Sequence, residues 1–363
     1  MSFRAQQGIW GWKAAWTTAL VVCALIASPI AHAAGYLICV TNERSNDVAL
    51  IDGNTRTTVT RIAVPGRPRG ISITPDGRHA FVALTRTALS GPPSAARLSH
   101  QNGDAGRAGD EHPKMMAGMR DGVAMIVLGD RKLVTVLPAG TDPEGVAVSD
   151  DGKRLFVTDE DASAISVVDV TEGRIEKTVP VKTEPEGVAF TPDGRQVWIT
   201  CETGGEIFIL SADDGEHIAE FKVDGRPRTV AFLPDGSRAF IPSETTGVVH
   251  VVDPHGRKVL TSIRFPPGAR PMGTRVSPDG KRLYVTTGRG GTLVVIDTKT
   301  NSVLDSIRVG TRPWGLAFSP DAKLLFTANG PSDDVSVVDL DQQKEIARMK
   351  AGTGPWGVAV APQ

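Results

Sequence analysis

Residues able to bind ions or to stack on a flat ligand occupy the middle of a Pro-x-Gly step that recurs along the chain. Carboxylates and guanidinium groups form charge-assisted hydrogen bonds, whereas tryptophan offers a flat apolar surface that attracts rings and cations. Function tends to gather where loops on a rigid scaffold differ, and this position differs between repeats. In chain order the middle residues are Arg69, Glu144, Glu186, Arg228, Met272, Trp314 and Trp356.

A second set of acidic side chains follows another apolar run in the same repeats. We expect both sets on one face, at the mouth of a central channel, as an acidic sector with basic flanks. Clustered charge can steer a partner, so we predict that this face binds a partner with a basic patch or a small ligand. The alternative is that the charges pair with one another and that each tryptophan packs against its neighbouring repeat. The second set comprises Asp159, Glu160 and Glu202.

The elements that position these residues form a repeat of about 42 residues. Each step opens an apolar run, as in Pro143 to Val148, and nearly every run leads into a turn, usually Pro-Asp-Gly. In such a turn proline presets φ, aspartate hydrogen-bonds the local backbone, and glycine accepts a positive φ. Ala322 takes the glycine position in one turn, where we expect mild strain. Three further runs with strand character complete the repeat.

Four strands in a repeat of this length predict an all-β fold, a seven-bladed β-propeller of four-stranded blades spanning residues 34–363. The chain ends after its seventh Pro-x-Gly run, whereas Tyr36 to Glu43 aligns with the second strand of a repeat. We therefore predict one blade built from both termini, which closes the ring without a free sheet edge. Aspartates that end the third strands, such as Asp169 and Asp297, are predicted to cap turns.

Residues 1–33 have the features of a secretory signal peptide. Arg4 and Lys13 flank the start of an apolar stretch, and an Ala-x-Ala cleavage site ends at Ala33. We therefore expect a periplasmic or secreted protein with no membrane span after cleavage. Removal of two basic residues leaves an acidic chain, which argues against nucleic acid as a partner. We expect a monomer.

The longest irregularity is an insertion at residues 85–121 in the second blade, which contains glycine, serine and proline and is predicted to be flexible. Imidazole and thioether groups can hold copper in an exported protein. No spacing repeats among them, so a mobile surface loop is the favoured interpretation. The weak candidate ligands are His112, Met115, Met116 and Met119.

Sequence motifs for catalysis are largely absent. The chain has no Gly-x-Ser-x-Gly elbow, no His-Glu-x-x-His and no Cys-x-x-Cys-His. We expect no cofactor and no metal centre, because the histidines occupy unrelated places in the repeat. Cys39 and Cys201 fall in distant blades and are predicted to remain free, buried thiols.

The repeats contain motifs such as Phe156 to Asp159, Tyr284 to Thr287 and Val335 to Asp339. With these motifs the chain resembles the YVTN family of bacterial seven-bladed propellers. The order of its steps further resembles the PQQ-dependent catabolism-associated propeller proteins. That resemblance implies a periplasmic quinoprotein dehydrogenase or a c-type cytochrome as partner, and it assigns no reaction. Thr229 in place of glycine and the insertion depart from the family pattern.

The sequence thus predicts a periplasmic, non-catalytic binding or accessory propeller associated with a PQQ-dependent (quinoprotein) alcohol oxidation system, with the channel mouth as its contact surface. One alternative is a propeller hydrolase such as a lactonase, and another is an envelope or adhesion interaction protein. The fold cannot separate these functions, because function depends on the site grafted onto the scaffold.

Overall fold

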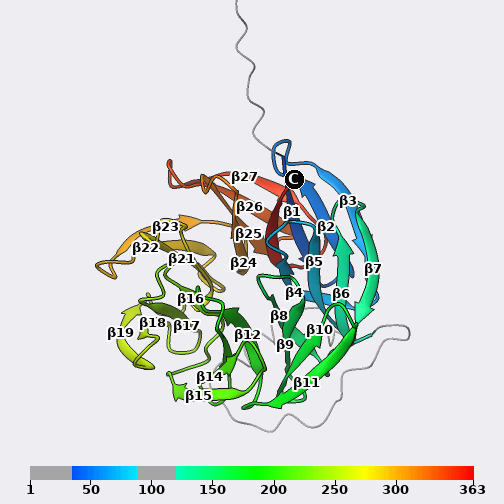
Figure 1. The fold of residues 1–363 in the computed structure, drawn as a ribbon. Helices are drawn as coiled ribbons and strands as arrows, with labels where there is room; N and C mark the ends of the chain where they lie inside the picture. The colour runs from blue at the N-terminus through cyan, green and yellow to red at the C-terminus, as the bar shows by residue number, and fades with distance from the viewer. Residues whose placement is uncertain (1–34, 88–119) are drawn as a thin grey trace, which may run out of the picture. The chain divides into compact units, whose positions relative to one another are not determined.

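The computed structural model describes residues 35–87 and 120–363. Within these ranges, seven four-stranded antiparallel sheets are arranged as blades around a centre, and there is no helix (Figure 1). This confirms the all-β, seven-bladed propeller. The proposed signal peptide at 1–33 and most of the insertion at 85–121, including its histidine and methionine candidates, lie outside the described residues. No helix long and apolar enough to cross a membrane occurs in the described part of the chain.

Each blade runs from an innermost strand at the channel to an outer strand at the periphery. The innermost strands of blades one to seven are β28 (Pro355–Pro362), β4 (Arg67–Ile73), β8 (Pro143–Val148), β12 (Pro185–Phe190), β16 (Ala231–Phe232), β20 (Pro271–Val276) and β24 (Pro313–Phe318). The second strands are β1 (Tyr36–Asn42), β5 (His79–Thr85), β9 (Arg154–Asp159), β13 (Gln196–Cys201), β17 (Ala239–Ser243), β21 (Arg282–Thr287) and β25 (Leu324–Asn329).

The two outer positions of each blade complete the sheets. The third strands are β2 (Asp47–Asp52), β6 (Gly122–Val127), β10 (Ala164–Asp169), β14 (Glu206–Ser211), β18 (Val248–Asp253), β22 (Thr292–Asp297) and β26 (Asp334–Asp339). The outer strands are β3 (Thr58–Ala63), β7 (Lys132–Leu137), β11 (Arg174–Pro180), β15 (His217–Lys222), β19 (Lys258–Arg264), β23 (Val303–Arg308) and β27 (Lys344–Lys350).

Blade one is built from both ends of the propeller, as the repeat alignment predicts. Strand β1 pairs with β2 on one side and with β28 on the other, with Tyr36 opposite Pro362 and Asn42 opposite Pro355. Figure 1 shows the C-terminal strand returning beside the first strand. This pairing gives β1 a hydrogen-bonded neighbour on each edge.

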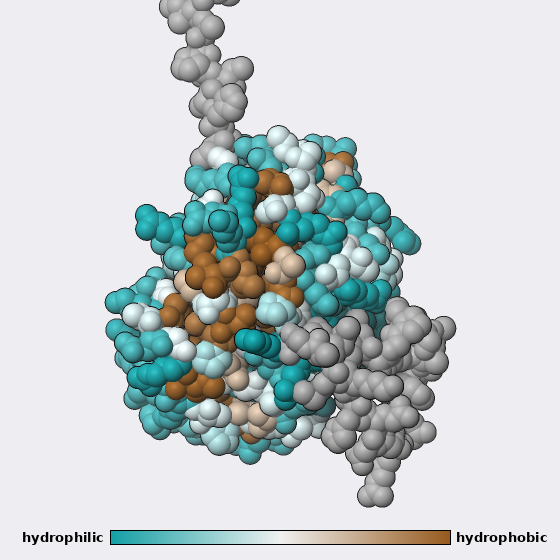
Figure 2. Space-filling model, turned by 90° about the vertical axis from the view of Figure 1, so that its right-hand side faces the viewer, coloured by the Kyte–Doolittle hydropathy of each residue, from teal (hydrophilic) through white to brown (hydrophobic). Residues whose placement is uncertain are grey.

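The core lies between the blades. The second and third strands are buried almost throughout, and each outer strand is largely exposed. Aromatic residues of the second strands, including Phe156 and Trp198, are fully buried. Apolar side chains also remain exposed on outer strands, for example Val134 and Leu260. Figure 2 shows apolar side chains gathered between hydrophilic margins on the side of the molecule it presents.

Turn chemistry follows the sequence prediction. Asp297 ends β22 and its Oδ1 accepts hydrogen bonds from the backbone N–H groups of Lys299 at 3.0 Å and Thr300 at 2.9 Å. The other third-strand aspartates named by the same argument accept equivalent bonds, as at Asp169. Ala322 has φ 53°, the left-handed conformation that its glycine counterparts adopt. Cys39 and Cys201 are buried and free, and burial raises the pKa of each thiol to about 12.

A repeated polar link ties each of several blades to the next. Thr200 on β13 accepts a hydrogen bond from the N–H of Gly187 at 2.8 Å and donates one to the carbonyl of Arg228 at 3.0 Å. A Cβ on Gly187 would lie 2.2 Å from that carbonyl, so the glycine permits the close approach of the two blades. Thr41, Thr158 and Thr286 make the equivalent pair of bonds in blades one, three and six.

Blade five obtains the same link by exchanging two residues. Pro242 stands where Thr200 stands in blade four, and Thr229 replaces the glycine of the step. The Thr229 hydroxyl itself donates to the carbonyl of Met272 at 3.1 Å. The inner strand of this blade is correspondingly reduced to Ala231–Phe232, with an isolated bridge between Pro227 and Ser243. The replacement of glycine by Thr229 therefore accompanies a shorter inner strand in blade five and preserves the hydrogen bond to the next blade.

Candidate binding and active site in the central channel

The innermost strands enclose a cavity of about 560 Å³ in the channel. Of the ten residues predicted from sequence to form a binding face, five line this cavity. They are Glu186, Arg228, Met272, Trp314 and Trp356. The other five, Arg69, Glu144, Asp159, Glu160 and Glu202, are not among the lining residues.

Arg228 is the centre of a buried ion-pair network. Its Nη1 donates to Glu186 Oε2 at 2.8 Å, its Nε donates to Glu244 Oε2 at 2.8 Å, and it also pairs with Glu202. Arg226 forms a further pair with Glu202. Arg228 is 6% exposed and Glu202 is 1% exposed, so these charges are buried rather than solvated. These charged side chains therefore pair with one another, which is the alternative considered from the sequence, and the pairs around Arg228 are also buried.

A second cluster joins blades two and three. Arg69 pairs with Glu144, which is 1% exposed, and both lie beside Glu160 and Asp142. Ligand oxygens of Asp142, Glu144 and Glu160 all lie within 4.8 Å of one another. Such a group has the spacing of cation ligands, and the Arg69 guanidinium is the cation already in contact with it.

Protonation relieves the repulsion within this cluster. Burial raises the pKa of Glu144 well above its ordinary value, Arg69 opposes that rise, and the charges of Glu186 and Glu160 add to it. Burial also raises the pKa of Glu160, and a hydrogen bond from Glu144 works against the shift. The pair can therefore share a proton, with Glu144 as donor and Glu160 as acceptor.

The two tryptophans stack on each other across the boundary of blades seven and one. Their ring centroids are 5.1 Å apart with an interplanar angle of 37°. The guanidinium carbon of Arg228 lies 5.1 Å from the Trp314 ring centroid, and that of Arg312 lies 5.6 Å from it. Both rings line the cavity and remain partly exposed, so they present an aromatic surface at its wall.

Asp159 has a local role in blade three. It is fully buried, its Oδ1 accepts a bond from the N–H of Gly140 at 2.9 Å, and its Oδ2 accepts one from Ser166 Oγ at 2.6 Å. Burial raises its pKa to about 6 against these bonds. The side chain fastens the end of β9 to its neighbours and lies away from the cavity lining.

The residues before the prolines of several steps carry strain. Asp142, Glu184, Arg270 and Arg312 have φ between 50° and 56°. The left-handed region is costly for side chains other than glycine, and a following proline disfavours the ordinary helical region as well. The charged side chains at these four positions therefore come with a conformational cost.

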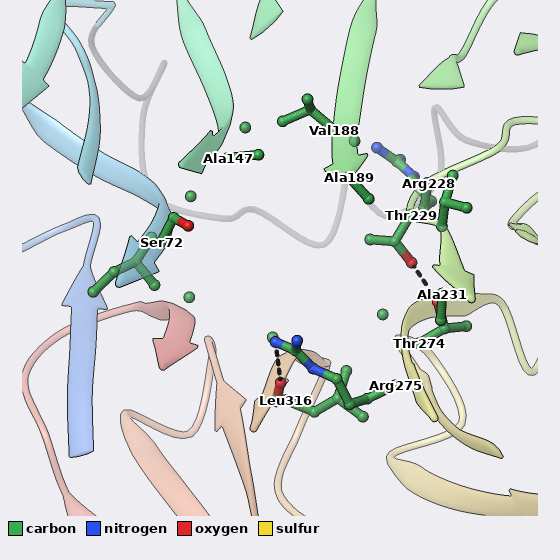
Figure 3. A pocket seen from close by; sticks show the side chains of 18 of the residues that line it. Ser72, Ala147, Val188, Ala189, Arg228, Thr229, Ala231, Thr274, Arg275 and Leu316 are labelled. Carbon is green, nitrogen blue, oxygen red and sulfur yellow. Dashed lines mark hydrogen bonds between the residues drawn. The ribbon is translucent and has the colours of Figure 1, made fainter. Parts of the chain in front are cut away.

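Arg275, which was not among the predicted site residues, borders the open centre of the pocket (Figure 3). Its Nη2 donates to the carbonyl of Leu316 at 3.4 Å, and no ion pair is recorded for it among the described residues. A signal was present in the repeats. The fifth residue of each inner run is Ser72, Ala147, Ala189, Ala231, Arg275, Ala317 or Ala359.

Two family models match parts of the chain. One describes a lactonase, 7-bladed β-propeller, and matches residues 181–353. The other describes an SMP-30/gluconolactonase/LRE-like region and matches residues 100–245. Each of these models covers less than half of the chain, so the matches show a likeness to lactonase-type propellers. None of the curated proteins compared with the chain matches it.

Solved structures with unrelated activities share the fold. A putative 6-phosphogluconolactonase from Bacteroides uniformis has a TM-score of 0.72 at 14% identity, covering 91% of this chain and 100% of that chain. Hydrazine synthase from Kuenenia stuttgartiensis has 0.67 at 18%, covering 83% and 96%. The dihydro-heme d1 dehydrogenase NirN has 0.61 at 18%, covering 89% and 74%. At these identities the likeness concerns the fold, so function must be argued from the site.

Proposed function

We propose that this propeller hydrolyses small lactones bound in its central channel. The observation that carries the proposal is Glu186, a carboxylate that lines a cavity of about 560 Å³ next to Arg228 and two tryptophans. Glu186, Arg228 and Trp314 all fall within residues 181–353, the segment matched by the lactonase model. The lactonase-type matches support this alternative more than a purely accessory role.

The chemistry requires a base, a fixed geometry and a surface for the ring. Glu186 accepts a proton from a water molecule as the water oxygen attacks the lactone carbonyl. The ring C–O bond then breaks, and the proton passes to the departing ring oxygen, which yields an open hydroxy acid. Arg228 orients Glu186 through the 2.8 Å bond to Oε2, and the Trp314 and Trp356 rings cover the apolar face of the lactone.

Lactone hydrolysis can be followed by proton release in a weakly buffered indicator solution. The panel should contain δ-valerolactone, glucono-δ-lactone and 6-phosphoglucono-δ-lactone, with Ca²⁺ or with a chelator, and spontaneous opening should be subtracted. We expect Glu186→Gln to lower kcat/KM at least 100-fold, as for loss of a general base. Glu172→Gln, an exposed change, should have no effect. Rates no faster than spontaneous opening for the whole panel, or full activity in Glu186→Gln, would refute the proposal.

The second candidate is a non-catalytic accessory propeller of a periplasmic quinoprotein oxidation system, after export directed by residues 1–33. Glu186, Glu202 and Glu244 form ion pairs with Arg228. Because these charges neutralise one another within the protein, they fit a structural role, which favours the accessory function. The YVTN-type repeats and the order of the steps support the same idea. The partner on this proposal is a quinoprotein dehydrogenase or a c-type cytochrome.

The accessory proposal is tested by capture from the native periplasm with tagged protein. Recovery of a dehydrogenase or cytochrome, weakened by Glu184→Lys at the partly exposed rim and unaffected by Glu172→Lys, would support it. Recovery of the tagged protein in the cytoplasm, or capture that is identical for the two variants, would count against it.

A further inference from the structure

Arg275 is a long, charged residue at a position of the inner runs that small residues occupy in the other blades. At the equivalent place of the other six inner runs stand Ser72 and five alanines. The pairing registers confirm the equivalence, since Arg275 lies opposite Tyr284 as Ala189 lies opposite Trp198 and Ala147 opposite Phe156. Four of these short side chains, those of Ser72, Ala147, Ala189 and Ala231, line the cavity together with Arg275. Figure 3 shows this arrangement, with Arg275 reaching across to Leu316 and Ser72, Ala147 and Ala189 around the opening.

The charge of Arg275 has no protein counter-ion in the described part of the chain. Three residues that line the cavity are charged, namely Glu186, Arg228 and Arg275. Glu186 is engaged by Arg228 at 2.8 Å, which leaves Arg275 with the neutral carbonyl of Leu316 at 3.4 Å. A guanidinium has five N–H donors and stays charged at every physiological pH. Most of its donors are therefore available to a ligand.

The channel wall makes this charge costly in the absence of an anion. Solvent reaches the Arg275 side chain through the channel. The surrounding protein nevertheless displaces part of the water around the guanidinium, and this loss of hydration lowers its pKa. A partly desolvated cation without a partner is destabilising, and a carboxylate or phosphate bound by two parallel N–H···O bonds compensates it.

We propose that Arg275 is an anion-binding residue inside the channel and that the ligand of this propeller carries a carboxylate or phosphate group. This deepens the proposed function, on which it rests for the lactone, by naming the substrate class as a small anionic lactone. The anionic end binds Arg275 in the channel, while the reacting carbonyl faces Glu186. Arg275 acts in recognition, and the proton transfer remains with Glu186.

The test measures binding separately from hydrolysis. Calorimetric titrations with inorganic phosphate, gluconate and 6-phosphogluconate, at low salt, should be made on the wild type, Arg275→Met, Arg275→Lys and Arg264→Met. Arg264 is an exposed arginine on β19 and serves as the matched control. We expect Arg275→Met to weaken binding at least tenfold, Arg275→Lys to weaken it less, and Arg264→Met to leave it unchanged. Comparison of phosphate with gluconate tells which anion the site prefers.

Outcomes for the two proposals differ. Anion binding that depends on Arg275, with no lactone hydrolysis, would uphold the anion site and refute the proposed function. Hydrolysis with equal kcat/KM for 6-phosphoglucono-δ-lactone in the wild type and Arg275→Met would refute the anion site alone. Absence of binding of all three anions to the wild type, or equal affinity in folded Arg275→Met, would also overturn it. Thermal unfolding of each variant establishes that it is folded.

Discussion

Arg228 and Arg275 line one channel from neighbouring blades, yet their surroundings are opposite. Arg228 is bound by three carboxylates and lies against a tryptophan. Arg275 has one long hydrogen bond to a carbonyl, and it shares the cavity lining with small side chains such as Ser72, Ala147 and Ala189. Residue type alone therefore does not distinguish an arginine that stabilises the fold from one that can bind a ligand. An arginine has a structural role where the protein itself supplies its counter-ion, and it is available to a ligand where the protein does not.

Removal of the Arg228 guanidinium should destabilise the protein more than any other change considered below. Arg228→Met leaves Glu186, Glu202 and Glu244 without their shared cation. We expect the free energy of unfolding to fall by about 3–5 kcal/mol at pH 7.5, as when one partner of a buried ion pair is removed. Urea unfolding measures the loss. The deficit should shrink at pH 5, because the abandoned carboxylates can then take up protons.

Arg275→Met is the matched change on the other side. It removes a cation without an internal partner, so we expect the free energy of unfolding to change by less than about 1 kcal/mol. Equal destabilisation by Arg275→Met and Arg228→Met, measured in the same urea series, would contradict the distinction between a structural and a recognising arginine.

The next effect concerns Glu144, a carboxyl that is only partly compensated. Because burial raises its pKa in the folded protein, the folded state holds the proton more tightly than the unfolded state. The free energy of unfolding should therefore fall as pH rises above the ordinary value of 4.5, towards the raised folded pKa. Glu144→Gln should lose this part of the slope, whereas Glu172→Gln should follow the wild type. Parallel urea series from pH 4.5 to 8 would decide, and identical slopes for Glu144→Gln and wild type would refute the raised pKa.

An uncharged hydrogen bond also connects the two blades that carry Arg228 and Arg275. Thr229 follows Arg228 and donates to the carbonyl of Met272 in the next blade at 3.1 Å. We expect Thr229→Val to cost about 1 kcal/mol of unfolding free energy, the typical net contribution of one hydrogen bond. The double variant Thr229→Gly with Pro242→Thr recreates the residue pattern of the other blades. In thermal unfolding it should be more stable than Thr229→Gly alone and should recover most of the stability that this single change removes. A double variant no more stable than Thr229→Gly alone would show that the exchange is not compensatory.

Much of the fold could be predicted because the repeat constrains it at several levels. The period sets the number of blades, the offset between the termini locates the closing blade, and the turn residues fix local φ values, including that of Ala322. The same logic assigned Asp297 and its equivalents to turns, since each ends a third strand. Periodic features are readable from one chain because each repeat serves as a comparison for the others.

The candidate site could be predicted only in part from the sequence, because its contacts form between residues of different blades. The sequence grouped Glu144, Glu186 and Arg228 on one face, yet it could not give their burial or their pairing, which arise across blade boundaries. Asp159 was expected with them because it lies at the end of a second strand, although its own oxygens accept hydrogen bonds from Gly140 and Ser166. Arg275 was not predicted because the middle residue of the Pro-x-Gly step varies most between repeats, whereas the position of Arg275 departs from a small residue in one repeat.

The threonine links give the ring an uneven resistance to opening. Ala83 and Ala328 occupy the threonine position in blades two and seven, so the boundaries after these blades lack the hydroxyl. One boundary is crossed instead by the pair of Arg69 with Glu144, and the other by the stacked tryptophans. Blades one and two therefore form a unit, and side chains from the Pro-x-Gly steps make the contacts at both of its boundaries, which we call hinges. An occupant of the mouth would tighten or loosen those hinges, and amide hydrogen exchange in blades one and two would register it as a cooperative unit.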